Sequence, residues 1–143
     1  MRGMTLIVKT ITRVILGFIV VFSASIILYG HITPGGGFAG GVMLACVFIL
    51  LVLAFGKEKA LDIVSKNALS VWDCLGALGF VVIAFLGFSG GFFFGNFIPR
   101  GTPLRLISGG TIIWSNIAIG IKVSACLSAA FITLIIFRLN REK

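Results

Sequence analysis

The chain has 143 residues, of which 59% are hydrophobic and only 11% are charged, and its mean hydropathy is +1.19. A soluble domain carries about 25% charged residues, so this composition excludes an ordinary soluble protein and predicts a multi-pass protein of the cell membrane, in contact with the lipid bilayer. The net charge of +8 does not indicate a nucleic-acid partner, because the basic residues lie at the ends of apolar segments, where they orient membrane helices.

Four apolar segments follow one another along the chain, each close to the length that crosses a bilayer as a helix. They cover about residues 12–30, 38–56, 68–88 and 112–139. We therefore predict an all-α membrane protein, taken as one membrane domain over residues 1–143, with four transmembrane helices in an up-down arrangement.

The connections between these spans differ in charge and composition. Segment 56–67 is polar with interleaved apolar residues, which is compatible with a short interfacial helix. Segment 89–111 is aromatic, and we expect it to fold back onto the membrane surface or to pack on a partner subunit. The amino-terminal segment, segment 56–67 and the carboxyl-terminal end carry three Lys or Arg each, whereas segment 30–38 carries none and segment 89–111 carries two. This bias predicts that both termini are cytoplasmic.

The connection between the first two spans is rich in glycine and reads His-Ile-Thr-Pro-Gly-Gly-Gly-Phe-Ala-Gly-Gly over residues 31–41. Glycine and proline permit sharp turns and close approach of backbones, and irregular backbone at membrane depth must be shielded by protein or line a polar cavity. We predict a turn here that meets neighbouring segments and borders an ion path, with close helix contact at its glycines. The turn residues are Thr33, Pro34, Gly35, Gly36, Gly37, Phe38, Gly40 and Gly41.

Two charged residues lie well inside predicted spans, away from the span ends. Lys122 lies about eight residues inside the fourth span, roughly 12 Å from its end, where a lysine costs ~2.5–3.5 kcal/mol and needs a carboxylate, carbonyls or water. Asp73 is the one acid within a span. Helix rise places the two roughly 10 Å apart along the membrane normal, so we expect no direct pair and an acid of another chain opposite Lys122. Either residue could serve an ion path, and a static ion pair between chains is the alternative.

Two further polar residues are candidates for the same path. Asn116 begins a series with Gly120, Ser124 and Ser128 at a spacing of four, which favours a close seam between helices, although the amide of Asn116 could also form hydrogen bonds along a path. His31 is the only histidine, and this residue type can titrate near neutral pH. For His31 we favour an interfacial residue that caps the first span.

The sequence lacks the patterns of an enzyme site. The cysteines Cys46, Cys74 and Cys126 form no CxxC pattern, so we expect neither a disulfide framework nor an iron–sulfur cluster. No nucleophile–base pair or metal-ligand cluster is visible. We therefore expect no catalytic residue, no metal and no cofactor in this chain.

The glycine-rich run over residues 31–41 resembles the signature of the MnhB/MrpB-like family, a class of small subunits of the Mrp-type multisubunit sodium/proton antiporters. A second set of runs resembles the loop and last span of the same family: Pro99-Arg100-Gly101-Thr102-Pro103, Ser108-Gly109-Gly110-Thr111-Ile112 and Asn116-Ile117-Ala118-Ile119-Gly120-Ile121-Lys122-Val123. The resemblance covers nearly the whole chain.

This resemblance implies a small four-helix subunit of a large membrane complex that exchanges sodium and protons. The implied partners are two large subunits related to the pump modules of respiratory complex I, and several small subunits. Related modules occur in archaeal membrane-bound hydrogenases and sulfur-reducing complexes. Hydrogenase or other iron–sulfur subunits are therefore further implied partners. The motif match carries a functional role over to residues 33–38 and Lys122.

Three hypotheses follow. In the first, the chain is an ion-translocation subunit in which Lys122 is a charged station. In the second, it is a scaffold subunit in which the same residues only hold the antiporter subunits together. A stand-alone exporter of small cations is disfavoured, because the first span has no acid to couple transport.

Overall fold

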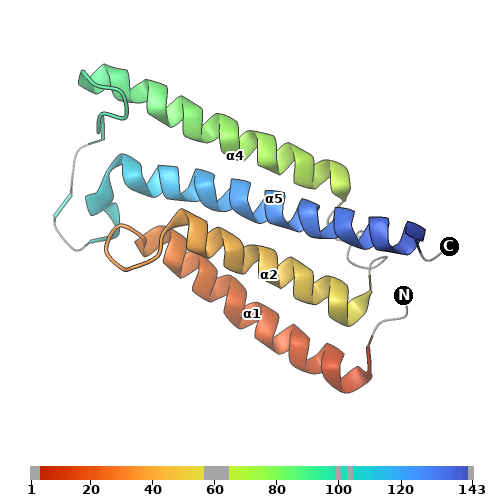
Figure 1. Ribbon diagram of the computed structural model, residues 1–143. Helices are drawn as coiled ribbons and strands as arrows, with labels where there is room; N and C mark the ends of the chain where they lie inside the picture. Colours follow the sequence, from red (N-terminus) through yellow and green to blue (C-terminus); the bar gives the residue numbers. More distant parts are fainter. Residues whose placement is uncertain (1–3, 57–64, 99–100, 103–104, 142–143) are drawn as a thin grey trace.

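A computed structural model describes residues 4–56, 65–98, 101–102 and 105–141 of the chain, and within these residues it contains helices and turns but no strand (Figure 1). Four helices are long and apolar enough to cross a membrane, which confirms the predicted fold class. They are α1 (Leu6–Tyr29), α2 (Gly37–Phe55), α4 (Lys66–Leu86) and α5 (Thr111–Arg141), with short 3₁₀ helices η1 (Gly87–Gly90) and η2 (Leu106–Gly109). The predicted interfacial helix over 56–67 falls mainly on residues outside the described ones.

The helices form a layer in the spatial order α4, α5, α2, α1 (Figure 1). Each helix runs in the direction opposite to the helix before it in the chain. The up-down arrangement is therefore confirmed, but the last helix of the chain lies between α2 and α4. Leu6 and Arg141 lie at one end of the layer, and the turn between α1 and α2 lies at the other end. This places both outer helix ends on the same side of any membrane that the layer spans.

Close contacts at glycine let α2 approach both of its neighbours. A Cβ atom on Gly40 would lie 2.9 Å from the carbonyl oxygen of Ser23 in α1, and one on Gly41 would lie 2.8 Å from the carbonyl oxygen of Gly120 in α5. Real Cβ contacts are not so short, so these positions accept only glycine at the present spacing. The expected close helix contact at Gly40 and Gly41 is present.

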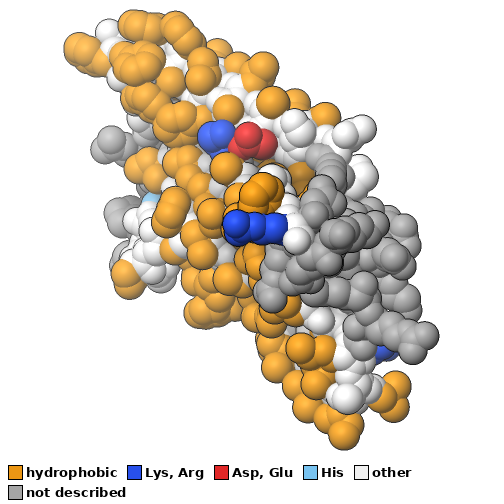
Figure 2. Space-filling view, turned by 45° about the vertical axis from the view of Figure 1, so that its right-hand side comes forward, with side chains coloured by type: hydrophobic (Ala, Val, Ile, Leu, Met, Phe, Trp, Pro, Cys, Tyr) orange, Lys and Arg blue, Asp and Glu red, His pale blue; other side chains and the backbone are white. Residues whose placement is uncertain are grey.

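The apolar core lies toward the end of the layer that holds Leu6 and Arg141. It joins three helices through the buried side chains of Phe48 and Val52 from α2, Leu69 from α4 and Ile132 from α5. Large hydrophobic side chains also cover the outer surface, as Figure 2 shows, which suits a chain surrounded by lipid or by other membrane subunits.

The segment after α4 folds back over the end of that helix. The ring of Phe94 lies 5.3 Å from the ring of Phe80 and 4.9 Å from the ring of Phe93, between centroids. A side-chain oxygen of Asn96 then accepts a hydrogen bond from the backbone N–H of Thr111 at 3.1 Å and caps the start of α5. The described part of segment 89–111 thus packs on its own chain.

Candidate functional site

The two charged residues deep within the helices are in direct contact. Nζ of Lys122 in α5 donates a hydrogen bond to Oδ1 of Asp73 in α4 at 2.8 Å, which is also the salt-bridge distance. Our expectation that Asp73 and Lys122 do not pair is wrong, because the chain itself supplies a carboxylate to Lys122. The expected acid of another chain opposite Lys122 stays a prediction.

The error came from counting the two depths from opposite ends of the bilayer. Counted from the end of the layer where α4 ends at Leu86 and α5 begins at Thr111, Asp73 lies 13 residues in and Lys122 lies 11 residues in. At 1.5 Å per residue these depths are about 20 Å and 17 Å, so the levels nearly match.

A glycine makes the short Lys122–Asp73 distance possible. A Cβ on Gly76 would lie 2.7 Å from the backbone nitrogen of Lys122 and 2.9 Å from the carbonyl oxygen of Ala118, so the backbones of α4 and α5 nearly touch one turn from the pair. Gly76 was named in neither sequence motif, although glycine three residues after an intramembrane acid is a signal that could have identified it.

The pair is accessible from one face of the chain. The side chain of Lys122 is 46% exposed and that of Asp73 is 34% exposed, despite their contact. Figure 2 shows a basic and an acidic side chain next to each other at the surface, bordered by hydrophobic side chains. A charged pair at this depth requires polar surroundings, from protein or from water.

The glycine turn has the predicted position between α1 and α2. Its first part is held by Tyr29, whose carbonyl oxygen accepts hydrogen bonds from the backbone N–H of Ile32 at 2.8 Å and from Oγ1 of Thr33 at 3.0 Å. Gly35 and Gly36 have φ angles of +146° and +108°, which L side chains rarely adopt. The glycines are therefore needed for the path of the backbone into α2.

Asn116 of α5 fits against this turn. Its backbone carbonyl oxygen occupies the place that a Cβ on Gly37 would take, and its Oδ1 would lie 3.6 Å from a Cβ on Gly36. Nδ2 of Asn116 is buried and has no hydrogen-bond partner among the described residues. The seam predicted for Asn116 and Gly120 is thus found, against α2 and its turn.

His31 joins the two connections at this end of the layer. Its Nε2 lies 3.3 Å from the carbonyl oxygen of Arg105, and a Cβ on Gly109 would lie 2.9 Å from the imidazole ring. Nδ1 of His31 is buried without a partner among the described residues. Pro34 and Phe38 of the turn are exposed, Phe38 by 67%.

The candidate residues therefore form two groups. Asp73 and Lys122 form the first, while His31, Asn116 and the glycine turn form the second. Asn116 and Lys122 are six residues apart on the same helix, which is about 9 Å of rise. The described residues contain no group of three or more His, Cys, Asp or Glu side chains arranged to hold a metal ion.

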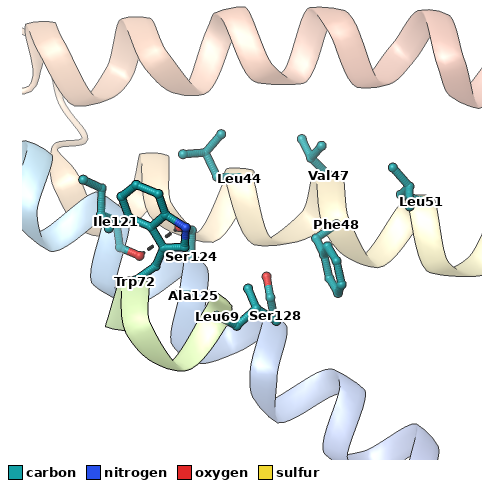
Figure 3. Close-up of a pocket in the computed structure, with 10 residues that line it drawn as sticks. All are labelled: Leu44, Val47, Phe48, Leu51, Leu69, Trp72, Ile121, Ser124, Ala125 and Ser128. Carbon is teal, nitrogen blue, oxygen red and sulfur yellow. Dashed lines mark hydrogen bonds between the residues drawn. The ribbon is translucent and has the colours of Figure 1, made fainter. Parts of the chain in front are cut away.

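A groove that the sequence did not reveal lies between α2, α4 and α5 (Figure 3). Its volume is about 360 Å³. Apolar side chains dominate its lining, which consists of Leu44, Val47, Phe48, Leu51, Leu69, Trp72, Ile121, Ser124, Ala125 and Ser128. The hydroxyl of Ser124 donates to the carbonyl oxygen of Ile121 at 3.0 Å within its own helix, so it offers little to a polar ligand.

These features define a polytopic helical membrane protein with an ionisable pair inside its spans, a combination typical of ion or proton pathways. The family model described as "Domain related to MnhB subunit of Na+/H+ antiporter" matches residues 7–129, and the chain belongs to this family. The resemblance to the MnhB/MrpB-like family is thereby confirmed.

Individual relatives agree with this family. An uncharacterised protein of Methanocaldococcus jannaschii is 43% identical over 111 residues, which are 73% of this chain and 42% of that protein. A protein of Staphylococcus haemolyticus named "Putative antiporter subunit mnhB2" is 32% identical over 90 residues, 61% of this chain and 64% of that protein. This chain thus spans less than two thirds of each of these relatives.

A solved structure has the same fold. It is titled "Structure of the membrane-bound sulfane sulfur reductase (MBS), an archaeal respiratory membrane complex", and one of its chains superposes with a TM-score of 0.78 at 30% identity. The similarity covers 93% of this chain and 61% of that chain. A membrane complex therefore contains a chain built like this one.

Proposed function

We propose that this chain is a translocation subunit of a multisubunit sodium/proton antiporter module and that Asp73 and Lys122 form a charged station on its ion path. The observation that carries the proposal is a lysine–aspartate contact of 2.8 Å, about 17–20 Å from the end of α4 and the start of α5, with both side chains partly accessible. Membrane proteins rarely keep such residues within their spans without a functional use.

Competition for one carboxylate gives the pair its proposed role. A sodium ion or a proton that reaches Asp73 takes the oxygen that now accepts from Lys122. The lysine, no longer paired, must then find another acceptor or release its own proton. Arrival of one cation is thereby coupled to movement of another charge, as exchange requires.

The glycine turn positions the end of this path. Gly35, Gly36 and Gly37 bring the backbone next to Asn116, whose unpartnered Nδ2 is about 9 Å of helix rise from the charged pair. By the distribution of basic residues, the chain ends are cytoplasmic and the turn lies at the opposite surface. We infer that His31 holds the two connections together there.

The most direct test is Lys122→Ala in the assembled complex. Sodium/proton exchange by everted membrane vesicles, normalised to the amount of complex, is expected to be lost, while the complex still purifies. Lys9→Ala is the matched control, because it also removes a lysine, but one in the first turn of α1 and away from the charged pair. Unchanged exchange in Lys122→Ala would refute the proposal.

A scaffold role is the second candidate, in which the same residues only hold the antiporter subunits together. In that case Gly36→Val and Lys122→Ala both dissolve the complex. Recovery of intact complex from both variants would count against a scaffold role.

The proposed partners are other membrane subunits of the same module. A mild-detergent pull-down of the tagged chain, followed by mass spectrometry, distinguishes two settings. Hydrogenase or other iron–sulfur subunits among the captured proteins would make the complex redox-driven, and antiporter-like subunits alone would make it a dedicated exchanger.

A further inference from the structure

The chain leaves hydrogen-bonding capacity unused at the Asp73–Lys122 pair. An ammonium group has three N–H donors, and Lys122 gives one of them to Asp73. Among the residues that the structure describes, the second carboxylate oxygen of Asp73 accepts no hydrogen bond. A further acceptor can therefore bind Lys122 without displacing Asp73.

The depth of the pair limits what can supply that acceptor. Lys122 lies 11 residues into α5, about 17 Å from the helix start, which is beyond the reach of lipid headgroups at that surface. Acyl chains carry no acceptor. From the other surface Asp73 lies seven residues into α4, about 10 Å from its start, which is still within the hydrocarbon layer. An acceptor at the depth of the pair therefore comes from protein or from water.

The nearest exposed neighbours of the pair, Ser70 on α4 and Cys126 on α5, are small, whereas Phe80, Val81 and Ile119 further along the same side are large. The pair face consists of Ser70, Asp73 and Ala77 on α4 and Lys122 and Cys126 on α5, which share a side by helical spacing. Away from the pair, exposed positions of α4 carry large side chains: Val71, Trp72, Leu75, Leu78, Val82 and Phe85. Small residues mark surfaces at which membrane helices pack closely on one another.

We propose that the pair face binds a membrane-spanning helix of another subunit, and that this helix presents an acceptor oxygen of an Asp, Glu, Asn or Gln side chain to Lys122. The two unused N–H donors of Lys122 require an acceptor on the partner helix. Small side chains let the partner helix approach. This inference rests on the proposed function, because it names the partner of the same charged station.

The groove of Figure 3 is a separate feature. Its lining residues Trp72 and Ile121 directly precede Asp73 and Lys122, so the groove and the pair lie on different sides of the α4–α5 contact. The partner helix proposed here therefore does not occupy the groove.

Photo-crosslinking in native membranes tests the proposal without disturbing the pair. A benzophenone amino acid replaces Ser70 in one variant and Leu75 in another, with Lys122 and Asp73 intact. Leu75 is the matched control, being 51% exposed on the opposite side of α4. Mass spectrometry then identifies the crosslinked peptide.

The Ser70 variant is expected to form an adduct with an apolar segment of one other subunit that contains an Asp, Glu, Asn or Gln, and the Leu75 variant is expected to lose that adduct. An adduct with a second copy of this chain, with lipid alone, or with that segment from Leu75 but not Ser70 would overturn the proposal.

A charge reversal adds a test of chemistry. Asp73→Lys combined with Lys122→Asp keeps an internal ion pair but turns an acceptor toward the partner's acceptor, so the double variant is expected to lose the partner on purification. Retention of the partner would contradict the proposed contact.

The two proposals fail separately. Normal exchange in Lys122→Ala refutes the translocation role and leaves the crosslink result valid, whereas an absent crosslink refutes the partner contact and leaves the result of the exchange assay unchanged.

Discussion

The helix α5 contacts α2 on one side and α4 on the other, and these two contacts are built differently. Toward α2, Gly41 lies against Gly120, and Gly37 lies against the backbone of Asn116. Toward α4, Gly76 gives an equally close approach, but a charged pair that remains half accessible follows one turn away.

This difference indicates that the α2–α5 contact mainly stabilises the fold, whereas the charged pair at the α4–α5 contact serves function. At the α2–α5 contact the glycines bring the two backbones together without a charged group. The α4–α5 contact places Lys122 where lipid is a poor solvent and leaves it donors to spare. Substitutions of the glycines at either contact should therefore act on folding, whereas substitutions of the charged pair at the second contact should act on transport.

The largest expected effect on stability comes from Gly37→Ala at the α2–α5 contact. The new Cβ would fall on the carbonyl oxygen of Asn116, which is backbone and cannot move aside cheaply. We expect a loss of about 3 kcal/mol, measured as the shift of thermal unfolding in detergent. Gly17→Ala is the control, since nothing lies within 4 Å of its Cβ, and it should unfold at or above the wild-type temperature.

A smaller loss, about 2 kcal/mol, is expected for Gly76→Ala at the α4–α5 contact. Its Cβ would lie 2.7 Å from the backbone nitrogen of Lys122 and would push the two helices apart. Gly79→Ala, one turn along, would place its Cβ 3.8 Å from that of Ala118 and should be tolerated. Equal unfolding of the two variants would show that the α4–α5 spacing is not set at Gly76.

The cap of α5 should contribute less than either glycine contact. Asn96→Ala removes the acceptor of the Thr111 N–H and is expected to cost about 1 kcal/mol. Asn96→Asp keeps a side-chain oxygen and should retain most of the stability. An equal loss in both variants would mean that the hydrogen bond is not the cause.

The smallest change in unfolding is expected for Asp73→Asn. Both members of the pair are accessible, so their contact adds little to the stability of the chain in detergent. Exchange by the assembled complex should nevertheless fall strongly. If Asp73→Asn unfolded at a much lower temperature than the wild type, the pair would stabilise the fold, as the Gly37 contact does.

Much of the fold follows from the sequence, because lipid leaves few alternatives to apolar helices of bilayer length. The turn at Gly35 and Gly36 and the contacts of Gly40 and Gly41 also follow from residue type. The position of α5 between α2 and α4 does not, since chain order says nothing about which helices touch. The Asp73–Lys122 contact was missed for a related reason: it depends on the relative levels of two helices of unequal length.

The claim that Asp73 and Lys122 act as one unit is tested most directly by a double-variant cycle on exchange. Asp73→Glu, Lys122→Arg and the combination keep both charges but alter the 2.8 Å contact. The rate of sodium-driven proton movement is measured for each assembled complex. If the pair is one station, the combined variant is expected to be no slower than the slower single variant, because the contact can be lost only once. Losses that multiply in the combined variant would show that the residues act independently and would contradict the account.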